Sequence, residues 1–220
     1  MWKIDEFFSL EGCPCPEAFA EVQYPWELLP RIEELIYAVV EKNPGKYRQI
    51  ADKVWVGEGT AIADTAVLYG PAVFGENCRI RPNAFVRENV LAGDGIVIGN
   101  ASEAKQVILF SEVQLAHFNY AGDSILGRGA HLGAGAIISN FKTTKDNVKV
   151  KVGEEVIETG LRKFGAILGD WAEVGCNAVL NPGTLVGRGS IIYPLTSVRG
   201  SVPAQTICKA PGVLIPRQPN

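Results

Sequence analysis

A six-residue repeat is the feature that most constrains what this chain can fold into. An aliphatic or aromatic residue returns at every sixth position from Ile50 onward, and glycine often follows it. These anchors are Ile50, Val56, Ile62, Leu68, Phe74, Ile80, Val86, Ala92 and Ile98. The phase then slips, so a loop or an irregular corner is expected before the later anchors. These are Tyr120, Leu126, Leu132 and Ile138, followed past Lys163 by Ile167-Leu168, Val174, Val186 and Ile192.

Six-residue periodicity has a direct structural interpretation. Each hexad forms one short strand and a corner, three hexads close a triangular coil, and the coils stack at roughly 4.8 Å, the spacing of hydrogen-bonded strands. The anchor side chain points into the prism, and glycine or asparagine at a corner can adopt positive φ. We therefore expect an all-β fold, a parallel β-helix of hexapeptide repeats. Hexads of this kind resemble those of the left-handed type, an exception to right-handed crossover connections.

The repeat divides the chain into three parts. Residues 1–49 lack the rhythm and contain an amphipathic helix that Pro30 opens and an Asn-Pro-Gly sequence stops. We expect this segment to form a small helical cap, most simply over the open end of the β-helix, with a docking arm for a partner as the alternative. Residues 50–207 form the predicted left-handed β-helix, with a lysine-rich loop inserted at 141–163. Residues 208–220 form a C-terminal tail that leaves the repeat.

The composition argues against several classes of function. A net charge of −3 and an isoelectric point near 5.5 do not favour broad nucleic-acid binding, which needs a basic face. No uncharged apolar run reaches the ~18 residues of a membrane span. The start MWKIDEFF lacks the basic end and apolar core of a secretory signal. An odd number of cysteines without an export signal predicts reduced thiols and a cytoplasmic protein. The cysteines are Cys13, Cys15, Cys78, Cys176 and Cys208.

The most specific stretch lies between Gly99 and Asn140. It reads G-N-x-x-E-x-K, then H-x-x-Y-x-G-D, then L-G-x-x-x-x-L-G-A-G-x-I-x-x-N. This pattern resembles the acetyltransferase domain of the bifunctional N-acetylglucosamine-1-phosphate uridyltransferase/glucosamine-1-phosphate acetyltransferase family, and the spacing agrees throughout. The segment 147–170 is similar to archaeal and related bacterial sugar-1-phosphate nucleotidyltransferase/acetyltransferases. The resemblance covers about residues 50–205.

The resemblance implies direct acetyl transfer from acetyl-CoA, as co-substrate, to the amine of an amino-sugar 1-phosphate or of a nucleotide-linked amino sugar. Such a transfer needs a base that takes a proton from the amine and donors for the carbonyl oxygen. Imidazole titrates near neutral pH. His117 matches the histidine of the family's H-x-x-Y-x-G-D motif, so it is the predicted general base, and no acyl-enzyme is expected.

Cationic and polar side chains are expected to hold the acceptor. A sugar 1-phosphate is a dianion, so cations should converge near the base. By resemblance, Arg87 and Lys105 match the family's phosphate-side residues. Tyr120 and Asn140 match its sugar contacts. His131 stands where the family has an asparagine that touches the amino sugar, so the identity or pose of the acceptor can differ here.

Three further positions bear on the acetyl donor, and two lysines on the acceptor. Ala134 matches a small donor-side residue of the family, Cys176 replaces a serine, and Tyr193 replaces a small residue near the coenzyme A site. Lys145 and Lys149 of the inserted loop are the nearest matches to the family's acceptor-side lysines. A soluble hairpin is an equally weighted explanation of that loop.

No metal is expected to take part in the transfer. Cys13-Pro-Cys15 has no second pair to complete a zinc site. The histidines His117 and His131 do not match the three-histidine zinc site, shared across a trimer interface, of carbonic anhydrases with a left-handed β-helix.

The resemblance also bears on partners. Enzymes of this architecture are typically homotrimers with sites between neighbouring prisms, so we expect a homotrimer that binds a small sugar phosphate and neither nucleic acid nor a membrane. Nothing in residues 1–49 matches the family's nucleotide-binding domain, so a separate nucleotidyltransferase is a candidate partner. The rival interpretation is a non-catalytic subunit that binds sugar phosphates or sugar nucleotides for such an enzyme. The altered donor side, with Tyr193 and Cys176, and the acidic N-terminal segment are the features that leave this rival open.

Overall fold

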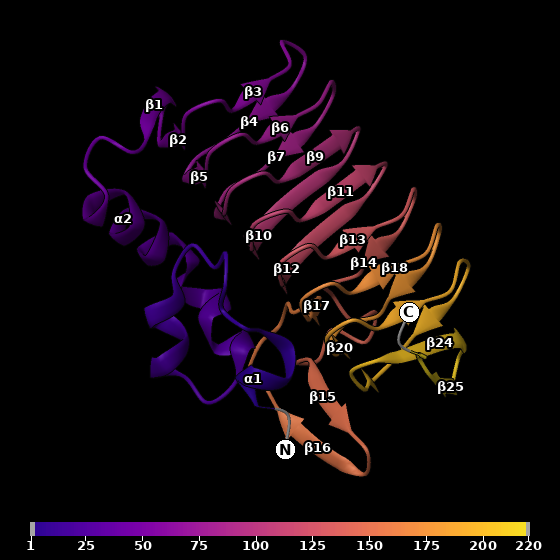
Figure 1. The fold of residues 1–220 in the computed structure, drawn as a ribbon. Coiled ribbons are helices and arrows are strands. Elements are labelled where there is room, and N and C mark those ends of the chain that lie inside the picture. The colour runs from indigo at the N-terminus through magenta and orange to yellow at the C-terminus, as the bar shows by residue number, and fades with distance from the viewer. Residues whose placement is uncertain (1–2, 219–220) are drawn as a thin grey trace.

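The computed structural model describes residues 3–218, and most of them form a parallel β-helix (Figure 1). Strands lie on three faces of a prism, and equivalent strands of successive coils pair in parallel. The first and third faces belong to one 14-stranded sheet, and the second face is a separate 9-stranded sheet. The predicted class, an all-β left-handed parallel β-helix of hexapeptide repeats with a small helical N-terminal part, is confirmed.

The three faces are named by their strands. The first face holds β2 (Val54–Val56), β5 (Ala72–Phe74), β8 (Val90–Ala92), β17 (Ala166–Leu168), β20 (Thr184–Val186) and β23 (Ser201–Val202). The second face holds β3 (Ala61–Ile62), β6 (Arg79–Ile80), β9 (Val97–Asn100), β11 (Gln114–His117), β13 (His131–Leu132), β18 (Glu173–Val174), β21 (Ile191–Ile192) and β24 (Thr206–Ala210). The third face holds β4 (Val67–Leu68), β7 (Phe85–Val86), β14 (Ile137–Ile138), β19 (Val179–Leu180) and β22 (Ser197–Val198). Two longer strands, β10 (Glu103–Leu109) and β12 (Tyr120–Leu126), run along both the third and the first faces.

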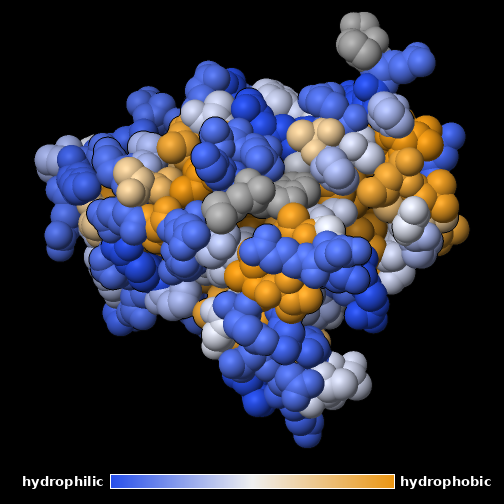
Figure 2. All heavy atoms as spheres, turned by 90° about the horizontal axis from the view of Figure 1, so that it is seen from below, coloured by the Kyte–Doolittle hydropathy of each residue, from blue (hydrophilic) through white to orange (hydrophobic). Residues whose placement is uncertain are grey.

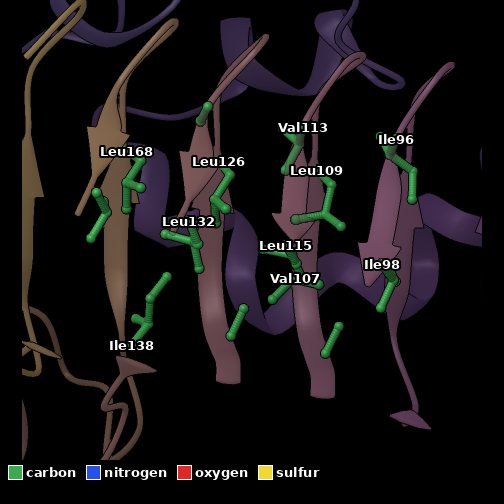
Figure 3. Close-up of a cluster of buried hydrophobic side chains, with 14 of the residues drawn as sticks. Ile96, Ile98, Val107, Leu109, Val113, Leu115, Leu126, Leu132, Ile138 and Leu168 are labelled. Carbon is green, nitrogen blue, oxygen red and sulfur yellow. The ribbon is translucent and has the colours of Figure 1, made fainter. Parts of the chain in front are cut away.

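Most of the hexad anchors form the core of the prism, and on the third face Ala121 takes the inward position expected for Tyr120. The core side chains point inward from all three faces and stack in columns from coil to coil, as Figure 3 shows for ten labelled residues. Ile98, Leu115 and Leu132 are fully buried and succeed one another along the second face. Because burial removes the apolar surface of most anchors from water, the repeat itself stabilises the fold.

The phase slips because one residue is missing from the same corner in two successive coils. Glu103 pairs with Phe85, a period of 18 residues, but Val107 pairs with Val90, a period of 17. The missing residue lies where the third face meets the first. There β10 and β12 continue from one face to the next without the usual break, and Gln106 has a φ of +52°. The predicted irregular corner is therefore a shortened one.

The lysine-rich insertion leaves and re-enters the β-helix at the same place. The backbone N–H of Phe164 donates to the carbonyl of Asn140 over 2.9 Å. Between them, β15 (Lys149–Val152) and β16 (Glu155–Glu158) form an antiparallel hairpin. Val148 at its base is fully buried with the N-terminal segment in a second apolar cluster.

The N-terminal segment consists of four short helices that cover the first face. These are α1 (Ile4–Phe7), the 3-10 helices η1 (Pro16–Glu21) and η2 (Pro25–Arg31), and α2 (Ile32–Lys42). Outward side chains such as Leu91, Ile108 and Ile125 are buried against them. The expected position over the open end is thus corrected, because the outer side of this face is apolar. The α-helix also begins at Ile32, two residues later than expected, after a 3-10 turn that contains Pro30.

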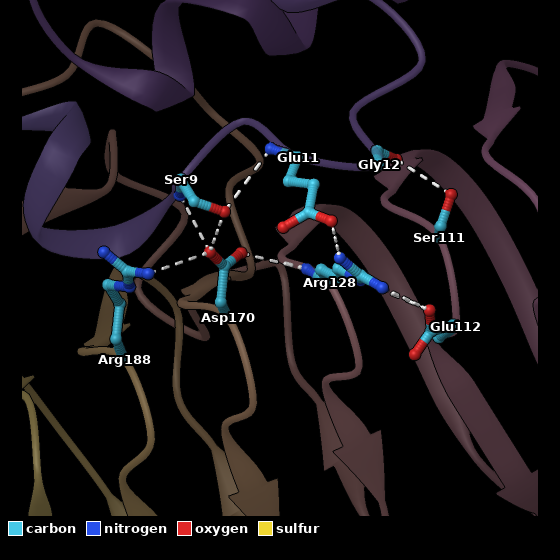
Figure 4. Close-up of polar contacts among 8 residues, drawn as sticks. All are labelled: Ser9, Glu11, Gly12, Ser111, Glu112, Arg128, Asp170 and Arg188. Atoms are coloured by element: carbon cyan, nitrogen blue, oxygen red, sulfur yellow. Dashed lines mark hydrogen bonds and ion pairs between the residues drawn. The ribbon is translucent and has the colours of Figure 1, made fainter.

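One buried carboxylate ties the N-terminal segment to the coils (Figure 4). Asp170 is 1% exposed, and its Oδ2 accepts hydrogen bonds from the N–H of Ser9 at 2.8 Å and from its hydroxyl at 2.9 Å. Its Oδ1 accepts from the N–H of Arg128 at 3.0 Å. The guanidinium of Arg188 lies 3.6 Å away. The segment is therefore fixed to the prism by polar contacts as well as by its apolar face.

Both ends of the repeat differ from the expected boundaries. Ile50 lies in β1 (Arg48–Ala51), which pairs antiparallel with β2, and it is 37% exposed instead of filling the prism. At the other end Cys208 continues the second face and is buried in the core, so the tail leaves the repeat only after β24. The last strand, β25 (Val213–Pro216), folds back antiparallel on β24.

The outside of the prism is mixed in character. Figure 2 views the molecule from below and shows apolar residues in patches between hydrophilic ones. Across residues 3–218 no helix has the length and apolarity that crossing a membrane would need.

Candidate functional site

His117 ends strand β11 at the edge between the second and third faces, which we call the His117 edge. Its backbone is held on both sides. Its N–H donates to Oδ1 of the buried Asn119 at 3.0 Å, and its carbonyl accepts from the N–H of Gly135 at 3.0 Å. The amide of Asn119 in turn donates to the carbonyls of Gly133 and Ala136. The imidazole is exposed, so a fixed backbone presents it to solvent.

The three predicted donor-side residues continue the same edge in the following coils. The N–H of Asn177 donates to the carbonyl of Ala134 at 2.9 Å, and the N–H of Leu195 donates to the carbonyl of Cys176 at 3.0 Å. Tyr193, two residues before Leu195, is 39% exposed. We call Ala134, Cys176 and Tyr193 the edge column. The structure therefore aligns Ala134 and Cys176 with His117 in successive coils and places Tyr193 one residue before the same edge position.

Most of the predicted acceptor residues gather on the third face. The polar cluster consists of Arg87, Glu103, Lys105, Tyr120, Asp123 and Asn140. Register places its backbone together, because Glu103 pairs with both Phe85 and Tyr120, and Lys105 pairs with Gly122. Lys105 and Asp123 sit at the shortened corner, and Asn140 is the last residue before the insertion.

The centre of the polar cluster is a buried charge pair. The Lys105 ammonium lies 3.6 Å from Oδ2 of Asp123, and each side chain is 10% exposed. The same carboxylate oxygen accepts a hydrogen bond from the amide of Asn140. A buried charge pair is stable only when the two charged groups are well placed toward each other and further hydrogen bonds satisfy their remaining polar atoms. The lysine is therefore held in place before any ligand arrives.

Tyr120 and Gly122 complete that centre. A Cβ atom on Gly122 would lie 2.6 Å from the Tyr120 hydroxyl and 2.7 Å from the Asn140 amide nitrogen, so only glycine leaves room for both groups. Burial raises the pKa of the Tyr120 hydroxyl, and the charges of Asp123 and Glu103 raise it further. A hydrogen bond with Asn140 acts in the opposite direction. Tyr120 thus remains a neutral hydroxyl beside the charge pair.

Arg87 occupies the outer part of the cluster. Its guanidinium lies 3.2 Å from Glu103 and 3.8 Å from Glu88, and the hydrogen bond with Glu103 is the main cause of its raised pKa. The side chain is 37% exposed. Arg87 is therefore a more accessible cation than Lys105.

His131 lies apart from the polar cluster. It begins strand β13 on the second face, and its Nδ1 is 2.8 Å from Oε2 of Glu173, its direct partner on β18. This hydrogen bond raises the pKa of His131. No hydrogen bond or ion pair within residues 3–218 joins it to the cluster.

The two lysines of the insertion are not brought to the cluster either. Lys149 belongs to the β15–β16 hairpin and pairs with Glu158 at 2.6 Å. Lys145 lies in the turn before the hairpin with a φ of +64°. Through residues 3–218, neither contacts the polar cluster by a hydrogen bond or an ion pair. The loop therefore has the contacts expected of a solvated hairpin, which was the alternative explanation.

Sequence reasoning did not select three acidic residues of this region. Glu103 and Asp123 stand within the quoted motif and could have been chosen as partners for Arg87 and Lys105. Glu173 had no such signal, because the insertion places it 42 residues from His131 and hides the pairing. The described part of the chain contains no group of three or more His, Cys, Asp or Glu side chains arranged to hold a metal ion.

Comparisons with known proteins identify the family. No family model matches the chain. The uncharacterized acetyltransferase YaiX of Escherichia coli O6:K15:H31 (strain 536 / UPEC) is 31% identical over 156 residues, which are 71% of this chain and 68% of that protein. The chain belongs to the acetyltransferase family of YaiX.

Longer relatives match over a part of their length. The bifunctional protein GlmU of Methanococcus maripaludis (strain C5 / ATCC BAA-1333) is 28% identical over 193 residues, which are 86% of this chain and 47% of that protein. The chain spans about half the length of the bifunctional relatives it matches. The predicted resemblance to bifunctional sugar-phosphate enzymes is confirmed by the match to GlmU. The match to YaiX confirms that the chain is an acetyltransferase relative.

Among solved structures, the similarity is weak. The S84A mutant of AntD, an N-acyltransferase from Bacillus cereus in complex with dTDP-4-amino-4,6-dideoxyglucose and coenzyme A, has 15% identity and a TM-score of 0.43. The match covers 76% of this chain and 82% of that one. A similarity as weak as this supports no conclusion about the site.

Proposed function

We propose that this chain is an acetyl-CoA-dependent N-acetyltransferase that acts on an amino sugar bearing a 1-phosphate or a nucleotide. The observation that carries the proposal is the position of His117. It stands where the edge column and the polar cluster meet, separated from Tyr120 by only Phe118 and Asn119. Membership of the YaiX acetyltransferase family supports the reaction class.

The polar cluster has the chemistry to bind the acceptor. A phosphate attracts Lys105 and Arg87, while the Tyr120 hydroxyl and the Asn140 amide can bond to sugar hydroxyls. The Asp123 carboxylate holds Lys105 and Asn140 in position and keeps their geometry fixed before binding. The acceptor amine would lie toward His117.

The edge column has the shape for a thioester donor. Its exposed residues line one prism edge in successive coils, so an extended pantetheine chain can follow them to His117. Lys209 lies over the Tyr193 ring with its ammonium 5.8 Å from the centroid, which adds a cation near the far end. Acetyl-CoA would then approach from the C-terminal coils.

The reaction needs one base during the attack. The amine nitrogen forms a bond to the thioester carbonyl carbon, the C–S bond breaks, and the coenzyme thiolate departs. His117 accepts the proton that the nitrogen loses and returns it to the sulfur, so the base is regenerated in each turnover. A positioned general base of this kind accelerates such a step about 10²–10⁴-fold.

A homotrimer is part of the proposal. Phe118 and Leu195 lie on the His117 edge and are 61% and 80% exposed, which is unusual for large apolar side chains in one line. A second copy packed against this edge would bury them and cover the edge column.

The experiment is product analysis with purified wild-type protein. Acetyl-CoA is combined with glucosamine 1-phosphate, galactosamine 1-phosphate or a nucleotide-linked amino sugar, and the acetamido product is measured by mass spectrometry together with thiol release. Product from at least one acceptor supports the proposal. Binding of a sugar phosphate without any product contradicts it and favours the binding-subunit interpretation.

A further inference from the structure

Two aromatic rings extend the third face beyond the polar cluster. Tyr69 follows β4 and lies beside Phe85 of β7, with the ring centroids 5.8 Å apart and the ring planes at 82°. Tyr69 is 57% exposed, and Phe85 is partly exposed. Within residues 3–218, neither ring belongs to an apolar cluster of the core. We call Tyr69 and Phe85 the aromatic pair, and it offers an apolar ring surface to solvent.

Strand register aligns the aromatic pair with the cations of the polar cluster. The strands β4, β7 and β10 pair in parallel as neighbours (Figure 1). The N–H of Tyr69 donates to the carbonyl of Val86, and the N–H of Arg87 donates to the carbonyl of Ala104, both over 2.9 Å. Tyr69, Arg87 and Lys105 therefore hold equivalent positions in three successive coils. Adjacent strands lie about 4.8 Å apart, so the Tyr69 ring is one coil from the accessible guanidinium and two coils from the buried ammonium.

The order of these groups matches the order of the parts of a nucleotide-linked amino sugar. From Asn140 toward the N-terminal coils, the third face presents the Tyr120 hydroxyl, then Lys105 and Arg87, then the aromatic pair. A nucleotide-linked amino sugar consists of the sugar, a diphosphate and a nucleoside. A sugar 1-phosphate ends at its phosphate and does not extend to the aromatic pair. A nucleobase does, and it stacks on an aromatic side chain because every base has a π-face.

A diphosphate needs a cation that can exchange one of its partners. Arg87 has five N–H donors, and Glu103 accepts from one of them at 3.2 Å. The Glu88 carboxylate lies 3.8 Å from the guanidinium and is 45% exposed, so it can turn to solvent when a phosphate binds. Each phosphate of a diphosphate ester carries one negative charge, so this exchange leaves the charge around Arg87 unchanged. The buried pair of Lys105 and Asp123 stays in place.

Building on the proposed function, we propose that the acceptor is a nucleotide-linked amino sugar and that the aromatic pair binds its base. Tyr69 stacks on the base, and Phe85 supports the Tyr69 ring from the side. Arg87 binds the diphosphate. The amino sugar lies over Tyr120, with its amine toward His117. No bond forms or breaks at the aromatic pair, so the pair acts on acceptor binding and on the choice of acceptor.

The test measures kcat/KM for uridine-, thymidine- and guanosine-diphosphate-linked amino sugars and for the matching amino-sugar 1-phosphates. Wild type and Tyr69→Ala are compared with acetyl-CoA at saturation. One base stacked on one aromatic side chain contributes roughly tenfold to binding, so wild type should prefer its best nucleotide-linked acceptor by about tenfold or more. Tyr69→Ala should lose about tenfold with that acceptor and nothing with the 1-phosphate. A general structural defect would lower both values equally.

Matched variants separate stacking from the loss of an exposed ring. Trp171 is 50% exposed and lies beside Arg128 at another corner, so Trp171→Ala should keep the wild-type ratio between the two kinds of acceptor. Tyr69→Phe keeps the ring and should also keep the ratio. If Tyr69→Ala does not fold, Tyr69→Leu decides by the same criterion, since it fills the position without a π-face.

Three results are decisive against the inference. Equal losses with both kinds of acceptor in Tyr69→Ala, or no loss with either, overturn the role of the aromatic pair. A wild type that prefers the 1-phosphate overturns the assignment of the acceptor. In each of these cases the proposed function stands. A wild type that acetylates neither kind of acceptor overturns the inference and the proposed function together.

Discussion

The ammonium of Lys105 lies 3.6 Å from the carboxylate of Asp123 at a corner of the β-helix that is one residue short. The two side chains come from strands that are continuous across this corner, β10 and β12. A regular corner would separate the third face from the first. Both side chains lie at this shortened corner as one buried pair, and this pair forms the centre of the polar cluster.

Lys105→Met should therefore affect both stability and acceptor binding. It leaves the carboxylate of Asp123 buried without its cation, which costs roughly 3–5 kcal/mol in such sites. The acceptor KM should rise at least tenfold, and the acetyl-CoA KM should stay unchanged. Urea unfolding and initial rates measure the two effects. Lys142→Met is the matched control, because its pair with Asp146 is exposed to solvent and should contribute little to stability. Equal stability losses in the two variants would contradict the buried-pair account.

Gly122→Ala tests the polar cluster without removing a charge. The new methyl group would meet the far ends of the Tyr120 and Asn140 side chains at 2.6 and 2.7 Å, and both can move aside. The acceptor KM should rise while the unfolding midpoint changes little. A variant with wild-type acceptor kinetics would show that these two side chains do not contact the substrate.

Asp170→Asn should loosen the N-terminal segment. An amide nitrogen would face the N–H donors of Ser9 or Arg128, so at least one hydrogen bond to a charged acceptor is lost and one donor is left unsatisfied. We expect a loss of roughly 2–4 kcal/mol in the free energy of unfolding. The exposed Asp64→Asn is the control. Hydrogen exchange should show faster exchange in residues 4–42 than in the coils.

Glu173→Gln should also change stability in a pH-dependent way. The pKa of His131 is raised in the folded protein, so the pair stabilises the fold fully below the unfolded value of about 6.5 and loses this effect as the pH rises through the folded pKa. Because the pair is partly exposed, the difference should be about 1 kcal/mol or less. Unfolding at pH 6 and pH 9.5 should show wild type favoured only at the lower pH. An NMR titration of the His131 ring should show its pKa falling in the variant.

The sequence predicted the fold because the hexads determine it residue by residue. Ile98, Leu115 and Leu132 each fill the prism where the repeat places them. The position of the N-terminal helices was not predictable in the same way. The sequence of an amphipathic helix shows which of its faces is buried but not which surface buries it. The apolar residues that contact the helices, such as Leu91 and Ile108, alternate with core anchors within the same short strands, so they do not stand out in the sequence.

The site was predictable to the extent that its residues are close in sequence. His117, Tyr120 and Asn140 stand within one continuous motif, so the motif specifies their positions. The partner of His131 depends on a pairing across the insertion, and no local pattern predicts that pairing. The placement of Lys149 depends on a hairpin in which it pairs with Glu158 on the opposite strand.

The most direct test of the central claim compares wild type with His117→Ala. Thiol release from acetyl-CoA is measured with the best acceptor, and binding of acetyl-CoA and of the acceptor is measured separately by calorimetry. The account predicts that turnover falls at least about 10²-fold while both ligands still bind, because the imidazole acts as base and its backbone contacts remain. Turnover near the wild-type rate in this variant would contradict the claim that His117 takes the proton from the attacking amine.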